Sequence, residues 1–253
     1  MAAARVVEAL GTVSAEAPQP ARRLAVVGAD PALAAAAGPL VPPANPSVTA
    51  LVYPQYGGLT ADAASVMVVA EQLWLREDEG GMTRRTVTVD VRLVRTRLGW
   101  VVTELRPAPG RPVAATLTGP AAALATSPRV DLPDAAVRDL AQGVVAPQVV
   151  DTLLRLSEDF RVAVSVLRSG HPERVFAGTA ISNHARGRAV DIWAVDGIAV
   201  ADMALDDPLL RRFLLAAAST RAGEIGGPTV PNRNDRYFAD DLHRDHVHIG
   251  FDR

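Results

Sequence analysis

Histidine is distributed unevenly along this chain of 253 residues. All five histidines fall between His171 and His248, and three of them lie in the segment HRDHVHIGF, residues 243–251. Histidine is the commonest neutral metal ligand and the side chain that most readily exchanges a proton near neutral pH. A second segment, SNHARGRAVDIW at residues 182–193, places a histidine and an aspartate seven residues apart around a glycine. Together the two segments predict a metal site whose ligands come from separate parts of the C-terminal half.

The composition narrows the possible chemistry. The chain contains no cysteine, so disulfides, thiolate metal sites and thiol catalysis are excluded, and any metal must be bound by His, Asp or Glu. The 26 basic and 28 acidic residues nearly balance, with no long run of one sign, which argues against a nucleic-acid-binding surface. No apolar run approaches the roughly 20 residues of a membrane span. A substrate of specific shape is therefore the expected partner, and the oligomeric state is left open.

The pattern of apolar residues indicates two domains joined by a linker. Residues 1–45 show helical spacing and then a proline-rich stretch, and residues 47–105 contain the alternating runs typical of antiparallel strands. Residues 107–130 collect proline, glycine and alanine, the usual composition of a linker. We therefore expect an amino-terminal α+β domain at 1–106 and a second domain at 131–253. With 49% hydrophobic residues, the chain can bury a core in each.

The first domain offers no catalytic constellation, because it has no histidine and its carboxylates are scattered. Its order of helices followed by an antiparallel meander resembles the cone-shaped nuclear-transport-factor-like and polyketide-cyclase-like folds. We expect it to be a spacer or a docking module that positions the second domain. The segment MAAARVVEALGTVSAEA lacks the charged start and long apolar core of a signal peptide, and it has the pattern of an amphipathic helix.

Four elements are expected in the second domain ahead of its last motif: a helix at 131–143, a helix at 147–160, a strand at 161–167 and a helix at 201–222. Asp131 is expected to cap the first helix. Asp206 or Asp207, just before Pro208, is expected to cap the last one, which covers the sheet. Residues 223–240 are rich in turn formers and are expected to border a cleft.

Three motifs occur in order in the second domain: VSVLRSGHP, SNHARGRAVDIW and HRDHVHIGF. In this order and spacing they resemble the D-alanyl-D-alanine carboxypeptidase-like zinc peptidases, whose fold is shared with the hedgehog signalling domain. The family pattern S-x-H-x-x-G-x-A-x-D is met by Ser182, His184, Gly187, Ala189 and Asp191, and its terminal acid-x-x-His is met by Asp245 and His248. The resemblance covers about residues 130–253. It implies an α+β domain in which helices pack on a small antiparallel sheet.

The resemblance implies that His184, Asp191 and His248 bind one catalytic zinc ion. Two histidines and one carboxylate are a complete ligand set for such an ion, which keeps a fourth position open. A straight strand would place residues seven apart on opposite faces. Gly187 is therefore expected to bend the chain so that His184 and Asp191 face one metal.

The remaining motif positions imply the catalytic groups. Asp245 is expected to be the general base, with a shorter arm than the glutamate that the family also uses there. Alternation along HVHIGF puts His246 on the same side as His248, so His246 also faces the pocket. Either His246 or Arg168 stabilises the oxyanion while zinc activates water and the scissile carbonyl. Arg168 and Ser182 are the expected ligands of a substrate carboxylate.

The other aromatic side chains of this domain are expected to have smaller roles. His171 and His243 are interpreted as structural residues or as residues at the rim of the site. Trp193 is interpreted as a core residue. Tyr237 and Phe238 either contact substrate or anchor their loop.

The resemblance implies a zinc-dependent peptidase that hydrolyses peptidoglycan stem or cross-link peptides, as a D,D-carboxypeptidase or an endopeptidase. The hedgehog branch of this fold retains zinc without turnover. A catalytically silent, zinc-containing module that binds a cell-wall peptide or a protein partner is therefore the alternative. A cell-wall substrate implies a location in the cell envelope of a bacterium.

Overall fold

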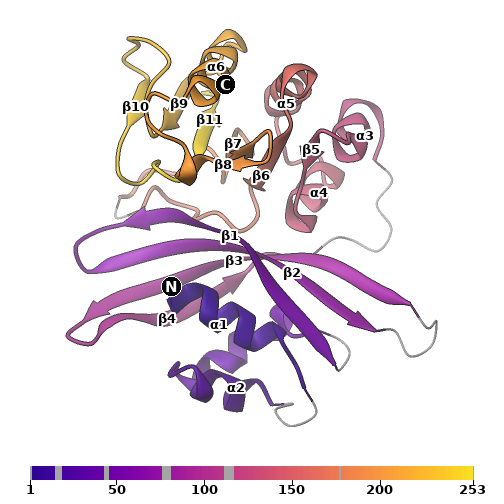
Figure 1. Cartoon of the computed structure of the whole chain (residues 1–253), viewed down its shortest axis with the longest axis vertical. Coiled ribbons are helices and arrows are strands. Elements are labelled where there is room, and N and C mark those ends of the chain that lie inside the picture. Colours follow the sequence, from indigo (N-terminus) through magenta and orange to yellow (C-terminus); the bar gives the residue numbers. More distant parts are fainter. Residues whose placement is uncertain are drawn as a thin grey trace. The chain divides into compact units, whose positions relative to one another are not determined.

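The computed structural model describes residues 2–14, 19–42, 46–75, 81–110, 117–176 and 178–252. The chain divides into two compact units, residues 1–110 and 111–253, and each is described by itself. Both units mix helices with β-sheet, as expected for an α+β chain (Figure 1). No helix in the described part of the chain is long and apolar enough to cross a membrane.

The first unit is a four-stranded antiparallel meander with helices on one face (Figure 1). Its elements are α1 (Ala2–Gly11), α2 (Pro20–Val26), the 3₁₀ turns η1 (Pro31–Ala36) and η2 (Gly38–Leu40), β1 (Ser47–Leu59), β2 (Ala63–Leu75), β3 (Met82–Thr96) and β4 (Gly99–Pro107). Alternate residues of β3, such as Val89 and Val91, join the apolar face of α1 in the core. The order of helices followed by an antiparallel meander therefore agrees with the sequence pattern.

The second unit is built on a seven-stranded sheet in the order β10-β9-β11-β7-β6-β5, with β8 paired to β7. Its elements are α3 (Gly119–Thr126), β5 (Val130–Asp131), α4 (Asp134–Ala141), α5 (Pro147–Asp159), β6 (Val162–Val166), β7 (Ala189–Val195), β8 (Ile198–Ala199), η3 (Val200–Asp202), α6 (Pro208–Ser219), β9 (Glu224–Gly227), β10 (Tyr237–Ala239) and β11 (Val247–Gly250). The pairs that involve β7 or β11 are antiparallel, whereas β5 with β6 and β9 with β10 are parallel. The expectation of an antiparallel sheet is thus wrong for these two edge pairs.

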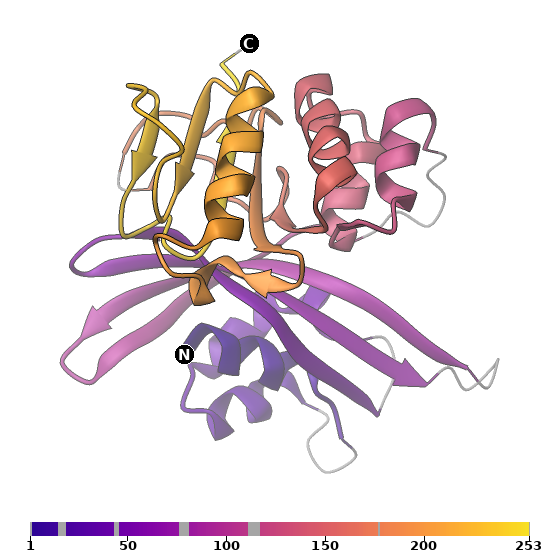
Figure 2. The same cartoon turned by 45° about the horizontal axis from the view of Figure 1, so that its top comes forward.

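Strands β7 and β11 form the centre of this sheet, although a long stretch of chain separates them. Val190 and Ile192 of β7 and Val247 and Ile249 of β11 point into one core with residues of α5 and α6. Figure 2 shows α6 lying across these strands. Because side chains alternate along a strand, the residues between these apolar positions face the opposite side of the sheet.

Several details of the second unit differ from the sequence prediction. Residues 223–240, expected to be a turn-rich loop, contain the strands β9 and β10. The helix expected at 131–143 corresponds to α4, which begins at Asp134 with Pro133 as its N-cap. Asp131 therefore does not cap it. Asp131 lies in β5 instead, where its carboxylate forms an ion pair with Arg161, 3.0 Å away. Part of the expected linker forms α3 and buries Leu124 in the core. The expected helix at 201–222 is shorter, because η3 precedes it and α6 ends at Ser219.

Asp207, rather than Asp206, caps α6. Its Oδ1 accepts hydrogen bonds from the backbone N–H groups of Leu209 (2.7 Å) and Leu210 (3.3 Å). We expect Asp207→Ala to lower the free energy of unfolding by about 1 kcal/mol, the usual cost of losing such a cap. Asp206→Ala removes an adjacent exposed carboxylate and is expected to change it by less than about 0.5 kcal/mol. Equal effects in urea-induced unfolding would show that the cap contributes nothing.

Candidate metal centre

The register of β11 on β7 places His248 directly opposite Asp191. Directly opposed residues on one face of an antiparallel pair have Cβ atoms only about 4.5–5.5 Å apart, so the two side chains meet. Both lie on the face of the sheet opposite the core residues of β7 and β11. His184 reaches the same point from the loop that precedes β7. The three side chains are almost completely buried, with 0% of His184, 1% of Asp191 and 8% of His248 exposed.

The three predicted ligands converge closely. Asp191 Oδ1 lies 3.0 Å from His184 Nε2 and 2.9 Å from His248 Nδ1, and the two histidine nitrogens are 3.2 Å apart. In a tetrahedral zinc site with bonds of about 2.0–2.1 Å, ligand atoms lie about 3.3 Å from one another. The donor atoms are therefore spaced nearly as a metal ion would require.

In both His184 and His248, the ring nitrogen that faces away from Asp191 is hydrogen-bonded to an oxygen acceptor. The backbone carbonyl of Leu167 lies 2.6 Å from His184 Nδ1, and Glu224 Oε1 lies 3.0 Å from His248 Nε2. These oxygens only accept, so His184 Nδ1 and His248 Nε2 carry hydrogen. Metal-binding histidines in proteins are usually oriented by this kind of outer hydrogen bond. Both rings therefore have the orientation that a ligand needs.

The charge of the buried Asp191 carboxylate governs the electrostatics of this centre. Burial by itself would raise the pKa of Asp191, but the charges of His184 and His246 and hydrogen bonds from His184 and His248 hold it well below its usual range. Burial would lower the pKa of His248, but Asp191 and Glu224 outweigh this effect and raise the pKa to about 9. Without a metal ion, a proton on His248 therefore balances Asp191. The donor set suits a cation such as zinc, which would displace that proton.

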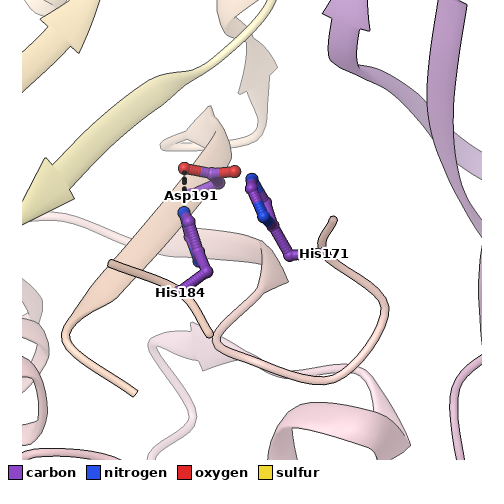
Figure 3. Close-up of side chains that lie close together, drawn as sticks. All are labelled: His171, His184 and Asp191. Carbon is purple, nitrogen blue, oxygen red and sulfur yellow. Dashed lines mark hydrogen bonds and ion pairs between the residues drawn. The ribbon is translucent and has the colours of Figure 1, made fainter. Parts of the chain in front are cut away.

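A fourth histidine, His171, also reaches this centre, and Figure 3 shows it beside His184 and Asp191. The three residues could hold a metal ion, since their ligand atoms all lie within 4.8 Å of one another. The rings of His171 and His184 are stacked 4.0 Å apart. Burial and the neighbouring His184 hold the pKa of His171 well below its usual value. His171, interpreted from the sequence as a structural residue or a residue at the rim of the site, therefore lies directly against the predicted ligand His184.

Ser182 shapes the loop that carries His184. Its buried hydroxyl accepts a hydrogen bond from the backbone N–H of His184 (3.2 Å) and lies 3.4 Å from His171 Nδ1. Gly187 then turns the chain with a φ of +67°, which confirms the bend predicted between His184 and Asp191. Ser182 thus links two histidines of the centre, and its contacts fit a role in holding the loop better than a role in binding a substrate carboxylate.

Asp245 and His246 form a pair at the side of the centre. Asp245 Oδ1 lies 2.7 Å from His246 Nδ1, and His246 Nε2 lies 3.8 Å from Asp191 Oδ2. His246 is buried and, like His248, approaches the Asp191 carboxylate, as the alternation predicts. The Asp245 carboxylate therefore orients His246 and directs the other ring nitrogen toward Asp191. This geometry makes His246, rather than Asp245, the group that faces the centre.

Arg168 is exposed at the end of β6. Its Nε donates to the backbone carbonyl of Ala185, the residue after His184, at 3.1 Å. Its backbone N–H donates to the buried carboxylate of Asp139, which also binds Ser169. Arg168 is thus tied to the loop that carries His184, and the residue is exposed.

His243 extends the cluster on the other side. Its Nδ1 lies 2.7 Å from Asp240 Oδ1, and its ring contacts Phe238 edge to face with centroids 4.8 Å apart. The centroid of the His246 ring is 4.9 Å away. Burial lowers the pKa of His243 to about 4. All five histidines of the chain therefore gather around one point, which the sequence indicated only for His184, His246 and His248.

Glu224 is a site residue that lies in none of the three motifs. It begins β9 opposite Gly250 of β11, and a Cβ at position 250 would overlap the Glu224 carboxylate. Its Oε1 accepts hydrogen bonds from His248 Nε2 (3.0 Å) and Asn183 Nδ2 (2.7 Å). The hydrogen bond from His248 is the main reason why its pKa falls to about 2. Glu224 thus links strand β11, which carries His248, to the loop that carries His184.

We expect Glu224→Gln to weaken zinc binding by about 10–100-fold, the usual loss when an outer partner of a ligand histidine is removed. The amide keeps the size of the side chain but removes the charge that makes the His248 ring more basic. Competition with a coloured chelator measures the dissociation constant. Glu158→Gln makes the same change on the exposed side of α5 and is the control. If both variants bind zinc as tightly as the unaltered protein, Glu224 does not support the ligand.

Comparison of the chain with protein-family models, curated proteins and solved structures finds no match. The function must therefore be inferred from the sequence motifs and the arrangement of these side chains.

Proposed function

We propose that the second unit is a zinc-dependent peptidase that hydrolyses peptidoglycan stem or cross-link peptides, as a D,D-carboxypeptidase or an endopeptidase. The observation that carries this proposal is the convergence of His184, Asp191 and His248, with donor atoms 2.9–3.2 Å apart. Bound there, zinc would supply Lewis-acid activation of the scissile carbonyl and of the attacking water.

His246 is the residue best placed to move the proton. Its Nδ1 is held by Asp245, so the lone pair of neutral His246 lies on Nε2, which faces the centre. A general base must lie within hydrogen-bonding reach of the proton that it removes, directly or through one water molecule. His246 would take a proton from the attacking water and return it to the leaving amine. Asp245 would hold the ring and stabilise its cationic form.

The resemblance of the three motifs supports the choice of a peptidoglycan peptide as substrate. Arg168 is the candidate partner for the terminal carboxylate of that peptide, since a guanidinium can bind a carboxylate through two hydrogen bonds. A cell-wall substrate would place the protein in the envelope of a bacterium.

Product analysis by mass spectrometry on defined stem peptides and on purified sacculi tests the proposal. The zinc-loaded protein is expected to release a D-alanine or to cut a cross-link, and chelation should stop the reaction until zinc is restored. Asp245→Ala should retain zinc and lose activity, whereas Asp241→Ala, a change at an exposed carboxylate nearby, should retain both. Zinc-loaded protein that cleaves none of these substrates would contradict the peptidase proposal.

One observation favours the alternative of a silent, zinc-containing binding module. His171 brings a third histidine to the centre, and structural zinc sites usually have four protein ligands. Such a module would bind cell-wall peptides or a protein partner without product formation.

A further inference from the structure

We propose that His171 is a fourth protein donor to the metal and that, in the resting protein, it fills the coordination position that a catalytic zinc keeps open. This inference rests on the proposed metal centre. It adds a residue that the zinc-peptidase motifs do not assign to the metal, and it bears on when a substrate can enter.

The hydrogen bonding of His171 resembles that of His184. His171 Nδ1 lies 2.8 Å from the backbone carbonyl of Pro172, and His184 Nδ1 lies 2.6 Å from that of Leu167. A carbonyl oxygen only accepts, so Nδ1 of each neutral ring carries the hydrogen and Nε2 carries the lone pair. A hydrogen bond of this kind to a backbone carbonyl commonly fixes the tautomer of a metal-binding histidine.

The two rings are stacked so that they present their nitrogens together. Their planes are inclined by only 14° and their centroids are 4.0 Å apart. In Figure 3 each ring points a nitrogen toward one end of the Asp191 carboxylate. Two imidazole lone pairs and a carboxylate that converge in a buried space all present electron pairs. Such a donor set suits a shared cation, because imidazole nitrogens and carboxylate oxygens are the ligands that zinc takes in proteins.

His171 is the donor that can move most easily. Asp191 and His248 are fixed on paired strands, whereas His171 stands on the loop after β6 and is only partly buried. The ligand atoms of His171, His184 and Asp191 lie within 4.8 Å of one another. That bound is wider than the separation of about 3.3 Å in a tetrahedral zinc site. A small rotation of the His171 side chain would bring it into or out of the coordination sphere.

The position of the His171 side chain would distinguish the two candidate functions. With His171 bound, four protein ligands would close the site, as in a structural zinc centre. With His171 turned away, His184, Asp191 and His248 would leave one position for chemistry. Substrate binding must therefore displace His171 before hydrolysis, and the resting protein is protected from exogenous metal ligands.

Protein loaded with Co²⁺ in place of zinc tests this inference without an activity assay, since azide binding at an open position changes the visible spectrum of Co²⁺. We expect azide to leave the spectrum of the unaltered protein unchanged and to shift those of His171→Ala and His171→Gln. X-ray absorption of the zinc forms should count three imidazoles in the unaltered protein and two in both variants. His243→Ala removes another histidine of the cluster and should behave like the unaltered protein.

The outcomes separate this inference from the proposed function. Two imidazoles and an equal azide response in the unaltered protein and both His171 variants would remove His171 from the ligand set and leave the peptidase proposal intact. Failure of the unaltered protein to take up Co²⁺ or zinc would overturn both. If one His171 variant does not fold, the other variant and the response of the unaltered protein to azide still decide the question.

Discussion

Asp191→Asn is expected to abolish tight zinc binding and, with it, the proposed peptidase activity. The amide keeps the size of the side chain but removes the only carboxylate among the three predicted ligands. Oδ1 of Asp191 lies within 3.0 Å of the donor nitrogens of both His184 and His248, so its negative charge is the electrostatic centre of the site. Loss of an outer partner alone costs about 10–100-fold in metal affinity, so loss of this ligand should exceed about 100-fold.

Chelator competition measures this loss directly, and thermal unfolding provides a second readout. A ligand present at 100 times its dissociation constant stabilises the native state by about 2.7 kcal/mol. Zinc should therefore raise the melting temperature of the unaltered protein but not that of Asp191→Asn. Asp245→Asn is the matched control, because its carboxylate contacts His246 at the side of the centre, and it should retain zinc. Wild-type zinc affinity in Asp191→Asn would place the metal elsewhere.

The local part of the candidate site could be predicted from the sequence. His184 and Asp191 are separated by one glycine turn, so their spacing already determines that both can face one point. The alternation in HVHIGF likewise places His246 and His248 on one side. These inferences depend on short segments whose geometry is nearly fixed by the backbone. The pairing of His248 with Asp191 depends instead on the register of β11 on β7, and only the resemblance to a family suggested it.

The supporting residues could not be predicted, because tertiary contacts alone define them. Glu224 matches no motif and becomes relevant only because β9 lies beside β11. His171 lies on the loop after β6, and along the sequence the rest of that long loop separates it from His184. Asp131 failed as a helix cap for a similar reason, since Val130 pairs with β6 and brings Asp131 to Arg161. In each case a contact between distant segments outweighs the local preference.

Gly187→Ala is expected to destabilise the second unit by more than about 4 kcal/mol, a size that is exceptional for one substitution. Gly187 has a φ of +67°, and an L-residue in this left-handed region costs about 1–2 kcal/mol. In addition, a Cβ at this position would overlap the backbone carbonyl of Val144 and lie 3.4 Å from the Cα of Val145. Rigid backbone cannot yield as a flexible side chain would. The nearby hydrogen bond from the N–H of Ala146 to the Gly187 carbonyl, 2.8 Å long, would also be strained.

Gly143→Ala separates the cost of the left-handed backbone from the cost of the overlap with Val144. Gly143 has nearly the same φ, +65°, but a Cβ there would meet nothing within 4 Å. It should therefore show only the backbone cost of about 1–2 kcal/mol. The difference between the two variants in denaturant-induced unfolding measures the overlap with Val144. Because Gly187 also closes the turn that carries His184, through a hydrogen bond from its N–H to the His184 carbonyl, zinc affinity should fall in Gly187→Ala and stay unchanged in Gly143→Ala. Equal stability and equal zinc binding in the two variants would mean that the loop after α4 does not hold the ligand turn in place.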